Sequence, residues 1–130
     1  MDSNFLPILK DAGRATLHNI DSYAAQVQGF TWDQLYQELA WLPQGGLNAA
    51  YECIDRHALG SFRDKTAMIW IGKNGQEERY TYHDMKVQSD KVAAGLRSIG
   101  IRKGDRVFLF LERVPELYAA FFGILKVGAV

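Results

Sequence analysis

The sequence predicts an α/β protein in which a helical N-terminal extension is followed by a β-hairpin and by the first, incomplete strand–helix units of a larger sheet. Three observations lead to this class. Several segments repeat apolar residues at helical spacing, two β-prone runs flank Asn74-Gly75, and an unalternated apolar run at residues 107–111 is followed by another helical pattern. An apolar run of that kind is typical of a strand covered on both faces, as in a parallel sheet.

The composition is that of a globular protein. The 130 residues are 48% hydrophobic, and 15 basic side chains balance 15 acidic ones. This neutral balance provides no basic patch for nucleic acid or anionic lipid, so we expect neither as a partner. No run reaches the roughly 20 apolar residues of a membrane span, and the N-terminus lacks the pattern of a signal peptide. A single cysteine, Cys53, allows no internal disulfide, and we expect a cytoplasmic protein.

The first 60 residues are predicted to be helical, apart from residues 1–18, which we expect to form an arm over a partner surface. A short helix starts near Asp21, and a second follows a capping box of Thr31 and Gln34 and ends by Pro43. A third has Asn48 as its N-cap and ends before Gly60. Its apolar residues recur every three or four positions, namely Leu47, Ala50, Tyr51, Ile54 and Ala58.

A β-hairpin is predicted around Asn74-Gly75, the dipeptide most typical of a two-residue turn, because both positions can adopt positive φ. Alternation along the strands defines two faces. One face carries Ala67, Ile69 and Ile71; the other carries Met68 and Trp70 with Tyr80 or Tyr82.

Two more helices are predicted beyond the hairpin. Thr81 and Asp84 begin one of about four turns that ends at Gly100, with an apolar stripe of Met85, Val92, Leu96 and Ile99. A tight turn with positive φ at Gly104 then leads into the apolar run at residues 107–111. The last helix begins at Pro115, a residue suited to the first helical position, and continues to about Val127.

The last helix is apolar around most of its circumference, which is typical of a helix inside a large domain. Its apolar residues are Leu117, Tyr118, Phe121, Phe122, Ile124, Leu125 and Val127. A strand, a helix and apolar residues after a glycine form two thirds of a βαβ unit, and the helix packs fully only when the next parallel strand returns. Five side chains without partners would cost on the order of 10 kcal/mol, comparable to the stability of a domain. We therefore expect the front part of a longer protein, which self-associates through this exposed helix; a complete small α+β domain is the alternative.

No residue is assigned a catalytic, cofactor-binding or metal-binding role. Asp55, Arg56 and His57 could transfer protons or pair with a ligand, but nothing beside them is spaced as a nucleophile or metal ligand, so a structural role is favoured. Cys53 has no Cys/His arrangement around it and is expected to pack within its helix. His83 likewise has no partner at useful spacing.

Two further patterns are similar to binding sites, but a structural role is favoured for both. The sequence GKNG at residues 72–75 precedes a strand rather than a helix, so it cannot cradle phosphate as a P-loop does. Trp70 with Tyr80 and Tyr82 could stack a nucleobase. Without interleaved basic residues, these aromatic side chains are expected to form core and strand surface.

From about Asn19 onward, the sequence resembles the N-terminal part of the AMP-forming acyl-CoA synthetases of the adenylate-forming superfamily, most closely the acetate–CoA ligases. The resemblance is carried, in order, by LNAAYECIDRHA, KTAMIWIG, ERYTYHDMKVQSDKVAAGLRSIGIRKGDRV and RVPELYAAFFGILKVGAV. An upstream stretch, NIDSYAAQVQGFTWDQLYQELAW, is similar to the extension of the bacterial acetate–CoA ligases and favours acetate or another short acid.

The resemblance implies a helical extension over residues 1–60 and the truncated beginning of an AMP-binding (adenylation) domain over residues 61–130. In the family, a carboxylate attacks the α-phosphate of Mg-ATP to give an acyl-adenylate and pyrophosphate, and the thiol of coenzyme A then displaces AMP. The residues that serve ATP, Mg and coenzyme A lie later in the family's sequences. The chain is therefore expected to be an inactive N-terminal fragment that binds none of them and has the rest of the parent ligase as its partner. The alternative is a stand-alone interaction or regulatory module that uses its exposed C-terminal apolar helix.

Overall fold

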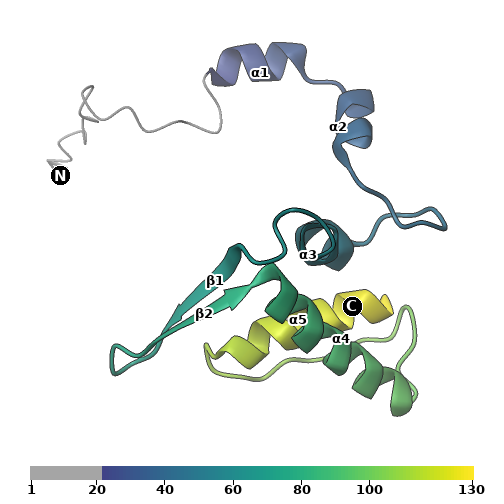
Figure 1. Cartoon of the computed structure of the whole chain (residues 1–130). Helices are drawn as coiled ribbons and strands as arrows, with labels where there is room; N and C mark the ends of the chain where they lie inside the picture. Colours follow the sequence, from purple (N-terminus) through teal and green to yellow (C-terminus); the bar gives the residue numbers. More distant parts are fainter. Residues whose placement is uncertain (1–21) are drawn as a thin grey trace, which may run out of the picture. The chain divides into compact units, whose positions relative to one another are not determined.

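The computed structural model describes residues 22–130 (Figure 1), and the arm predicted at residues 1–18 lies outside them. The chain divides between Tyr36 and Gln37 into two compact units. The elements are α1 (Tyr23–Gly29), α2 (Trp32–Glu38), the π-helical turn η1 (Tyr51–Asp55), α3 (Arg56–Ala58), β1 (Thr66–Ile71), β2 (Glu77–Thr81), α4 (Tyr82–Ser98) and α5 (Pro115–Val127). The described part is thus a mixture of helices and one small antiparallel sheet.

The two helices of the extension begin at the predicted places. Ser22 Oγ accepts a hydrogen bond from the Ala25 N–H at the start of α1, at 3.3 Å. Before α2, the Thr31 and Gln34 side chains each accept a hydrogen bond from the other's backbone N–H at 3.3 Å, which is the predicted capping box. Neither helix has a buried residue, so capping rather than packing defines where they begin.

A clasp of Glu52 and Arg56 holds the chain that leads from α2 into the second unit. The Glu52 carboxylate accepts the N–H groups of two consecutive residues, Ala40 at 3.1 Å and Trp41 at 2.9 Å. Arg56 Nη1 lies 3.0 Å from Glu52 Oε2 and donates to the Glu38 carbonyl at 3.1 Å. Trp41 has a φ of 52°, which a bulky residue rarely adopts. The carboxylate therefore fixes an otherwise unfavourable backbone turn.

The third predicted helix is present, and it contains a π-helical turn. Asn48 Oδ1 caps it by accepting the N–H groups of Ala50 at 2.9 Å and Tyr51 at 3.2 Å. The Arg56 N–H bonds to the Tyr51 carbonyl, five residues earlier, which defines the π turn. Ile54 is buried, and Asn48 Nδ2 donates to the Leu125 carbonyl at 2.7 Å. The cap thus also joins this helix to the end of α5.

The hairpin has the predicted faces but a different turn. Met68 pairs with Tyr80 and Trp70 with Glu78, so these four side chains share one face of the sheet. The Gly72 N–H bonds to the Gln76 carbonyl at 2.7 Å, and Gly75 has a φ of 78° while Asn74 does not have positive φ. The prediction of a two-residue turn is therefore wrong. The loop has three residues, with glycine in the left-handed position.

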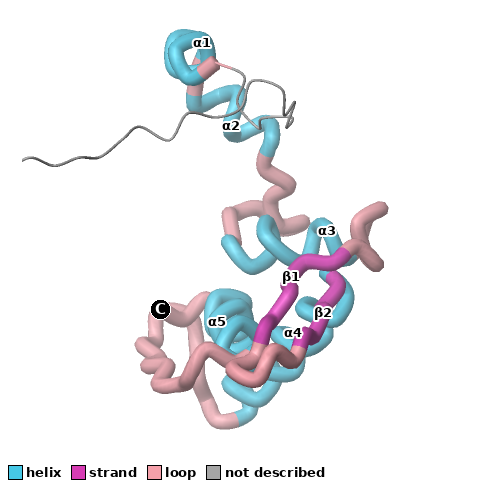
Figure 2. The backbone as a smooth tube through the Cα atoms, turned by 90° about the vertical axis from the view of Figure 1, so that its left-hand side faces the viewer, coloured by secondary structure: helices cyan, strands magenta, loops and turns pink. Residues whose placement is uncertain are grey.

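Helix α4 begins at the predicted capping box and packs along α5. The Thr81 Oγ1 accepts the Asp84 N–H at 3.1 Å, and Asp84 Oδ2 accepts the Thr81 N–H at 2.9 Å. A Cβ on Gly123 of α5 would lie 2.6 Å from Val92 Cγ1 and 3.0 Å from the Ser89 carbonyl oxygen. The absence of a side chain at this glycine therefore allows α4 and α5 to approach closely. Figure 2 shows the hairpin beside α4.

Helix α5 has the predicted bounds, Pro115 to Val127, and it is covered on one side. The residues buried in it are Pro115, Ala119, Gly123, Ile124 and Val127. On the other side, Tyr118 is 41% and Phe121 is 49% exposed. The helix is thus apolar around its circumference, as predicted, but Tyr118 and Phe121 remain largely uncovered.

The apolar run at residues 107–111 does not form the expected buried strand in this chain. The side chains of Phe108 and Phe110 are 96% and 102% exposed. Val130 alone pairs with this segment: its N–H bonds to the Asp105 carbonyl at 2.8 Å, and its carbonyl accepts the Val107 N–H at 2.8 Å. These two bonds are the pattern of a parallel pair. Parallel pairing across α5 therefore starts here, but within residues 22–130 no neighbouring strand covers Phe108 and Phe110.

None of the helices within residues 22–130 combines the length and the apolar character that crossing a membrane requires.

Candidate functional site

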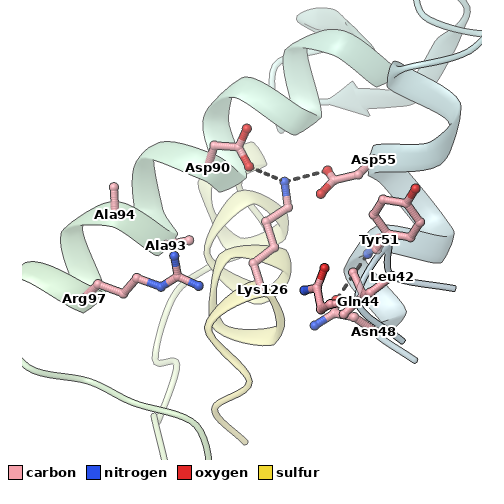
Figure 3. A pocket seen from close by; sticks show the side chains of 10 residues that line it. All are labelled: Leu42, Gln44, Asn48, Tyr51, Asp55, Asp90, Ala93, Ala94, Arg97 and Lys126. Atoms are coloured by element: carbon pink, nitrogen blue, oxygen red, sulfur yellow. Dashed lines mark hydrogen bonds and ion pairs between the residues drawn. The ribbon is translucent and has the colours of Figure 1, made fainter. Parts of the chain in front are cut away.

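A pocket of about 410 Å³ lies where η1, α4, α5 and the loop before η1 meet (Figure 3). The loop before η1 is held in place by the hydrogen bond from the Trp41 N–H to the Glu52 carboxylate and by the bond from Asn48 to the Leu125 carbonyl. Helices α4 and α5, which approach closely at Gly123, form another side of the pocket. The pocket is lined by Leu42, Gln44, Asn48, Tyr51, Asp55, Asp90, Ala93, Ala94, Arg97 and Lys126.

The Lys126 ammonium lies between two carboxylates at one side of this pocket (Figure 3). Its Nζ is 2.6 Å from Asp55 Oδ1 and 2.6 Å from Asp90 Oδ1, and the lysine side chain is only 9% exposed. The contact between Lys126 and Asp90 is both a hydrogen bond and an ion pair. The contact between Lys126 and Asp55 Oδ1 is an ion pair without a hydrogen bond. One ammonium therefore joins α5 to both η1 and α4.

Asp90 is shared between two lysines, and this sharing shifts its acidity. Lys86 Nζ lies 2.5 Å from Asp90 Oδ2, one helical turn away. Burial alone would raise the pKa of Asp90, but hydrogen bonds from Lys126 and Lys86 outweigh it, so the pKa falls below the ordinary value of 3.8. The same hydrogen bond to Asp90 raises the pKa of Lys86. Asp90 and Lys86 are thus each stabilised in their charged forms.

Acid is expected to weaken the fold through Asp90 and Asp84. The pKa of Asp84 is also lowered, because the Thr81 hydroxyl and backbone N–H both donate to its carboxylate. A lowered folded-state pKa stabilises the fold above the unfolded pKa of about 3.9, and this stabilisation is lost as the pH falls through the folded value. The free energy of unfolding, measured with urea, should therefore fall steadily below about pH 4.

The variant Asp90→Asn tests this prediction. Asparagine cannot titrate, so this variant should be less stable than the parent at pH 7 but should lose less stability between about pH 4 and pH 2. Equal losses in the two proteins would show that Asp90 does not contribute to acid sensitivity.

The chemistry of the pocket is that of a structural junction. Two carboxylates already neutralise Lys126, and no serine, cysteine or histidine lines the pocket beside a general base. Across the part of the chain that the structure describes, no group of three or more His, Cys, Asp or Glu side chains is placed to hold a metal ion. Arg97, which also lines the pocket, is exposed.

Asp55, Arg56 and His57 point to different partners rather than to one site. Asp55 pairs with Lys126, and Arg56 belongs to the clasp with Glu52. The His57 ring packs on Tyr82 with their centroids 5.0 Å apart, and burial, followed by the charge of Arg56, lowers the pKa of His57. These contacts support the structural role expected for the three residues.

Cys53 is exposed, so the expectation that it packs within its helix is wrong. Cys53 lies in the π-helical turn and lines a second, mainly apolar pocket of about 320 Å³. This pocket is lined by Cys53, Ile54, Ala67, Met68, Tyr82, Met85, Tyr118 and Phe122. No histidine lies among these residues to activate the thiol.

The aromatic side chains of the hairpin are bound within the fold. The Trp70 indole N–H donates to the Arg113 carbonyl at 2.7 Å, and its ring covers Gly72 so closely that a Cβ there would lie 2.7 Å from it. The Tyr80 hydroxyl donates to the Glu78 carboxylate, and this bond raises the pKa of Tyr80 to about 12. These contacts support the interpretation of the aromatic residues as strand surface rather than a stacking site.

His83 is the remaining candidate. Its Nε2 lies 3.2 Å from Nη2 of Arg63. A general base is usually oriented by a carboxylate, whereas the neighbour of His83 is a cation.

Sequence reasoning missed Lys126, the residue around which the first pocket is built. A signal for it was present: apart from Glu116 near the start, Lys126 is the only charged side chain in an otherwise apolar helix. A lysine in such a position is almost never buried unless it is paired. The sequence could therefore have indicated a buried ion pair, although not its two partners.

Comparisons with known proteins place the chain in one family. A family model described as AMP-binding enzyme matches residues 55–130. Acetyl-coenzyme A synthetase of Bacillus subtilis is 40% identical over 114 residues, which are 87% of this chain and 20% of the relative. Acetyl-coenzyme A synthetase of Pseudoalteromonas translucida is 37% identical over 107 residues, 82% of this chain and 16% of the relative.

Solved structures agree with these relatives. An acyl-CoA synthetase of Brucella canis superposes with a TM-score of 0.75 at 32% identity, over 85% of this chain and 20% of that one. A fatty acid AMP ligase of Legionella pneumophila superposes with a TM-score of 0.58 at 30% identity, over 62% of this chain and 14% of that one. The chain thus spans about a fifth or less of the length of these proteins. Since the family model alone matches more than half of its residues, the chain belongs to the AMP-binding enzyme family.

Proposed function

We propose that this chain is the N-terminal fragment of an AMP-forming ligase that joins acetate or another short acid to coenzyme A. The parent would convert ATP, the carboxylate and coenzyme A into acyl-CoA, AMP and diphosphate through an acyl-adenylate. The observation that carries this proposal is the match to acetyl-coenzyme A synthetase over 87% of the chain, which extends well upstream of residue 55. This upstream match supports a helical extension in common with these relatives, whereas the fatty acid ligase matches 62% of the chain.

Within this proposal, residues 1–60 are the helical extension and residues 61–130 begin the adenylation domain. The rest of the parent ligase is the partner of this fragment. The exposed apolar residues of α5 and of the run at 107–111 support such a partner, because burying them would stabilise the fold.

ATP, Mg and coenzyme A belong to the parent in this proposal, and the described pocket does not fit a triphosphate. Asp55 and Asp90 place two carboxylates in its lining, and both already pair with Lys126. A triphosphate carries negative charge that these carboxylates would repel. The hairpin turn at Gly72 has no helix after it whose N-terminus would receive phosphate.

The fragment is expected to be inactive alone. Incubating the 130-residue chain with ATP, Mg²⁺, acetate and coenzyme A should release no AMP above a protein-free blank, measured by chromatography of the nucleotides. The synthetase from Bacillus subtilis, assayed in parallel, serves as the positive control. AMP formation that increases with the amount of fragment would overturn the prediction of inactivity.

The alternative is a stand-alone interaction or regulatory module that uses α5. The exposure of Tyr118 and Phe121 is the observation that favours it. The coding sequence after codon 130 distinguishes the two: a continuation into a strand and a Gly/Ser/Thr-rich loop supports the ligase, and a stop codon supports the module.

A further inference from the structure

Arg56 connects the clasp to a histidine. Its Nη1 lies 3.0 Å from the Glu52 carboxylate and donates to the Glu38 carbonyl at 3.1 Å. The Nε of the same guanidinium donates to Nε2 of His57 at 3.4 Å. A ring nitrogen accepts a hydrogen bond only while it carries no proton, so this contact requires neutral His57 with its proton on Nδ1. One contact of the clasp therefore depends on pH.

The surroundings of His57 make a further positive charge at this place unfavourable. The charged and titratable groups that face its ring are Arg56 and Glu52 of its own helical segment, Lys65 of the loop before β1, and Tyr82 of α4. Burial, followed by the charge of Arg56, lowers the pKa of His57. The charge of Glu52 acts in the opposite direction, and that of Lys65 lowers the pKa further.

The ring of His57 is held in place, whereas the side chain of Arg56 can move. The imidazole packs on two aromatic rings, with centroid distances of 5.0 Å to Tyr82 and 5.9 Å to Phe62. Aromatic rings attract cations, so these contacts persist when the imidazole is charged. The Arg56 side chain is 34% exposed and reaches solvent by rotating about its own bonds. Repulsion between the two cations is therefore relieved by movement of Arg56.

We propose that His57 is a pH-sensitive switch of the clasp: when its Nε2 takes up a proton from solvent, Arg56 moves away and releases the Glu38 carbonyl. The protonated ring has two N–H donors and no acceptor, so the contact with the Arg56 N–H is lost. All of these residues belong to the second unit, and the proposal does not depend on the proposed function.

Release of Arg56 weakens the remaining part of the clasp. The Glu52 carboxylate loses its cation and holds the backbone N–H groups of Ala40 and Trp41 without that support. Trp41 has a φ of 52°, an unfavourable value for a bulky residue, so its backbone leaves this conformation once it is held less firmly. The segment at residues 38–41 therefore opens more often in the protonated protein.

The switch operates between about pH 7 and pH 5. The pKa of His57 lies below its ordinary value of 6.5 while the clasp is closed. A lowered pKa stabilises the closed form above about pH 6.5, and this stabilisation is lost as the pH falls through the lowered value. The carboxyl groups of Asp84 and Asp90 have pKa values below 3.8, so their titration lies outside this range.

Amide hydrogen exchange of the 130-residue chain, followed by NMR, tests the proposal. Protection factors remove the intrinsic pH dependence of exchange, and those of the Ala40 and Trp41 amides should fall at least about threefold between pH 7 and pH 5. The imidazole signals of His57, recorded in the same samples, should titrate with the same midpoint as this loss. The amide of Ala93, which is buried in α4, should keep its protection.

Two variants isolate the charge of the imidazole. In His57→Gln the amide oxygen can accept the Arg56 N–H at every pH, so the protection of Trp41 should stay constant between pH 7 and pH 5. His83→Gln is the matched control, because His83 contacts Arg63 rather than the clasp. This variant should keep the full pH dependence of the parent chain.

Arg56→Met tests the same coupling from the other side. Without the neighbouring cation, the pKa of His57 should rise, because the charge of Arg56 lowers it in the parent chain. The Ala40 and Trp41 amides should then be less protected already at pH 7.

Four results would overturn the proposal. In the unmodified chain they are equal protection of Ala40 and Trp41 at pH 7 and pH 5, a midpoint that differs from that of the His57 imidazole, and an equal loss at Ala93, which would mean general unfolding. The fourth is a loss of the same size in His57→Gln, which would mean that another group opens the clasp.

Discussion

Replacing Lys126 by methionine should lower the free energy of unfolding by about 3 kcal/mol. Methionine keeps the length of the side chain, so the main loss is the charge between Asp55 and Asp90. Removing one partner of a buried ion pair leaves an uncompensated charge and costs about 3–5 kcal/mol. The lower end applies here, because Asp90 is 44% exposed and keeps its contact with Lys86. Denaturation by urea at pH 7, followed by circular dichroism, measures the change.

Two further variants isolate the role of the charge. Lys91→Met removes an exposed lysine of α4 and should change stability by less than about 0.5 kcal/mol. Adding Asp55→Asn to Lys126→Met removes the stranded carboxylate and should recover more than half of the loss. If Lys126→Met is as stable as the parent protein, the ion pairs do not stabilise the junction of η1, α4 and α5.

The variant Gly123→Ala should lower the free energy of unfolding by about 2 kcal/mol, although alanine is the better helix former. The added Cβ would lie 2.6 Å from Val92 Cγ1 and 3.0 Å from the Ser89 carbonyl oxygen, and a backbone oxygen cannot move aside as a side chain can. Overpacking a close contact costs about 1–3 kcal/mol, while the gain in helix propensity is at most about 1 kcal/mol. Thermal unfolding and urea denaturation both measure the difference.

Gly95→Ala is the matched control, because the chain offers a second helical glycine in different surroundings. A Cβ on Gly95 of α4 would meet no atom within 4 Å. The substitution should therefore raise stability by about 0.5–1 kcal/mol through helix propensity alone. If the two alanine variants change stability in the same direction, the close approach of α4 and α5 does not depend on Gly123.

Much of the helical structure follows from signals that are local in the sequence. Thr81 with Asp84 and Thr31 with Gln34 each form the capping box that their spacing predicts. Pro115 begins α5, and Gly128, with a φ of 81°, ends it. Such signals involve residues three or four positions apart, so the sequence specifies them without knowledge of the tertiary fold.

The features that were not predicted depend on distant residues or on one local dihedral angle. Lys126 meets Asp90 and Asp55 only because three elements pack together, and no local pattern specifies such a meeting. The length of the hairpin loop depended on the φ of Asn74, which asparagine allows to take either sign. The apolar run at residues 107–111 indicates burial, but burial needs neighbouring strands, and the described chain supplies only Val130. The absence of catalytic residues remains a prediction.

The clasp between Glu52 and the turn at Ala40 and Trp41 has a consequence for shortening this protein. A chain that starts before Glu38 retains both N–H donors of the carboxylate and the carbonyl that Arg56 contacts. A chain trimmed to start at Leu47, close to the beginning of the family match at residue 55, would lose all three groups. The Glu52 carboxylate would then keep only its ion pair with Arg56. The stretch between α2 and η1 is therefore an integral part of the second unit, and a natural place to divide the chain is near Tyr36.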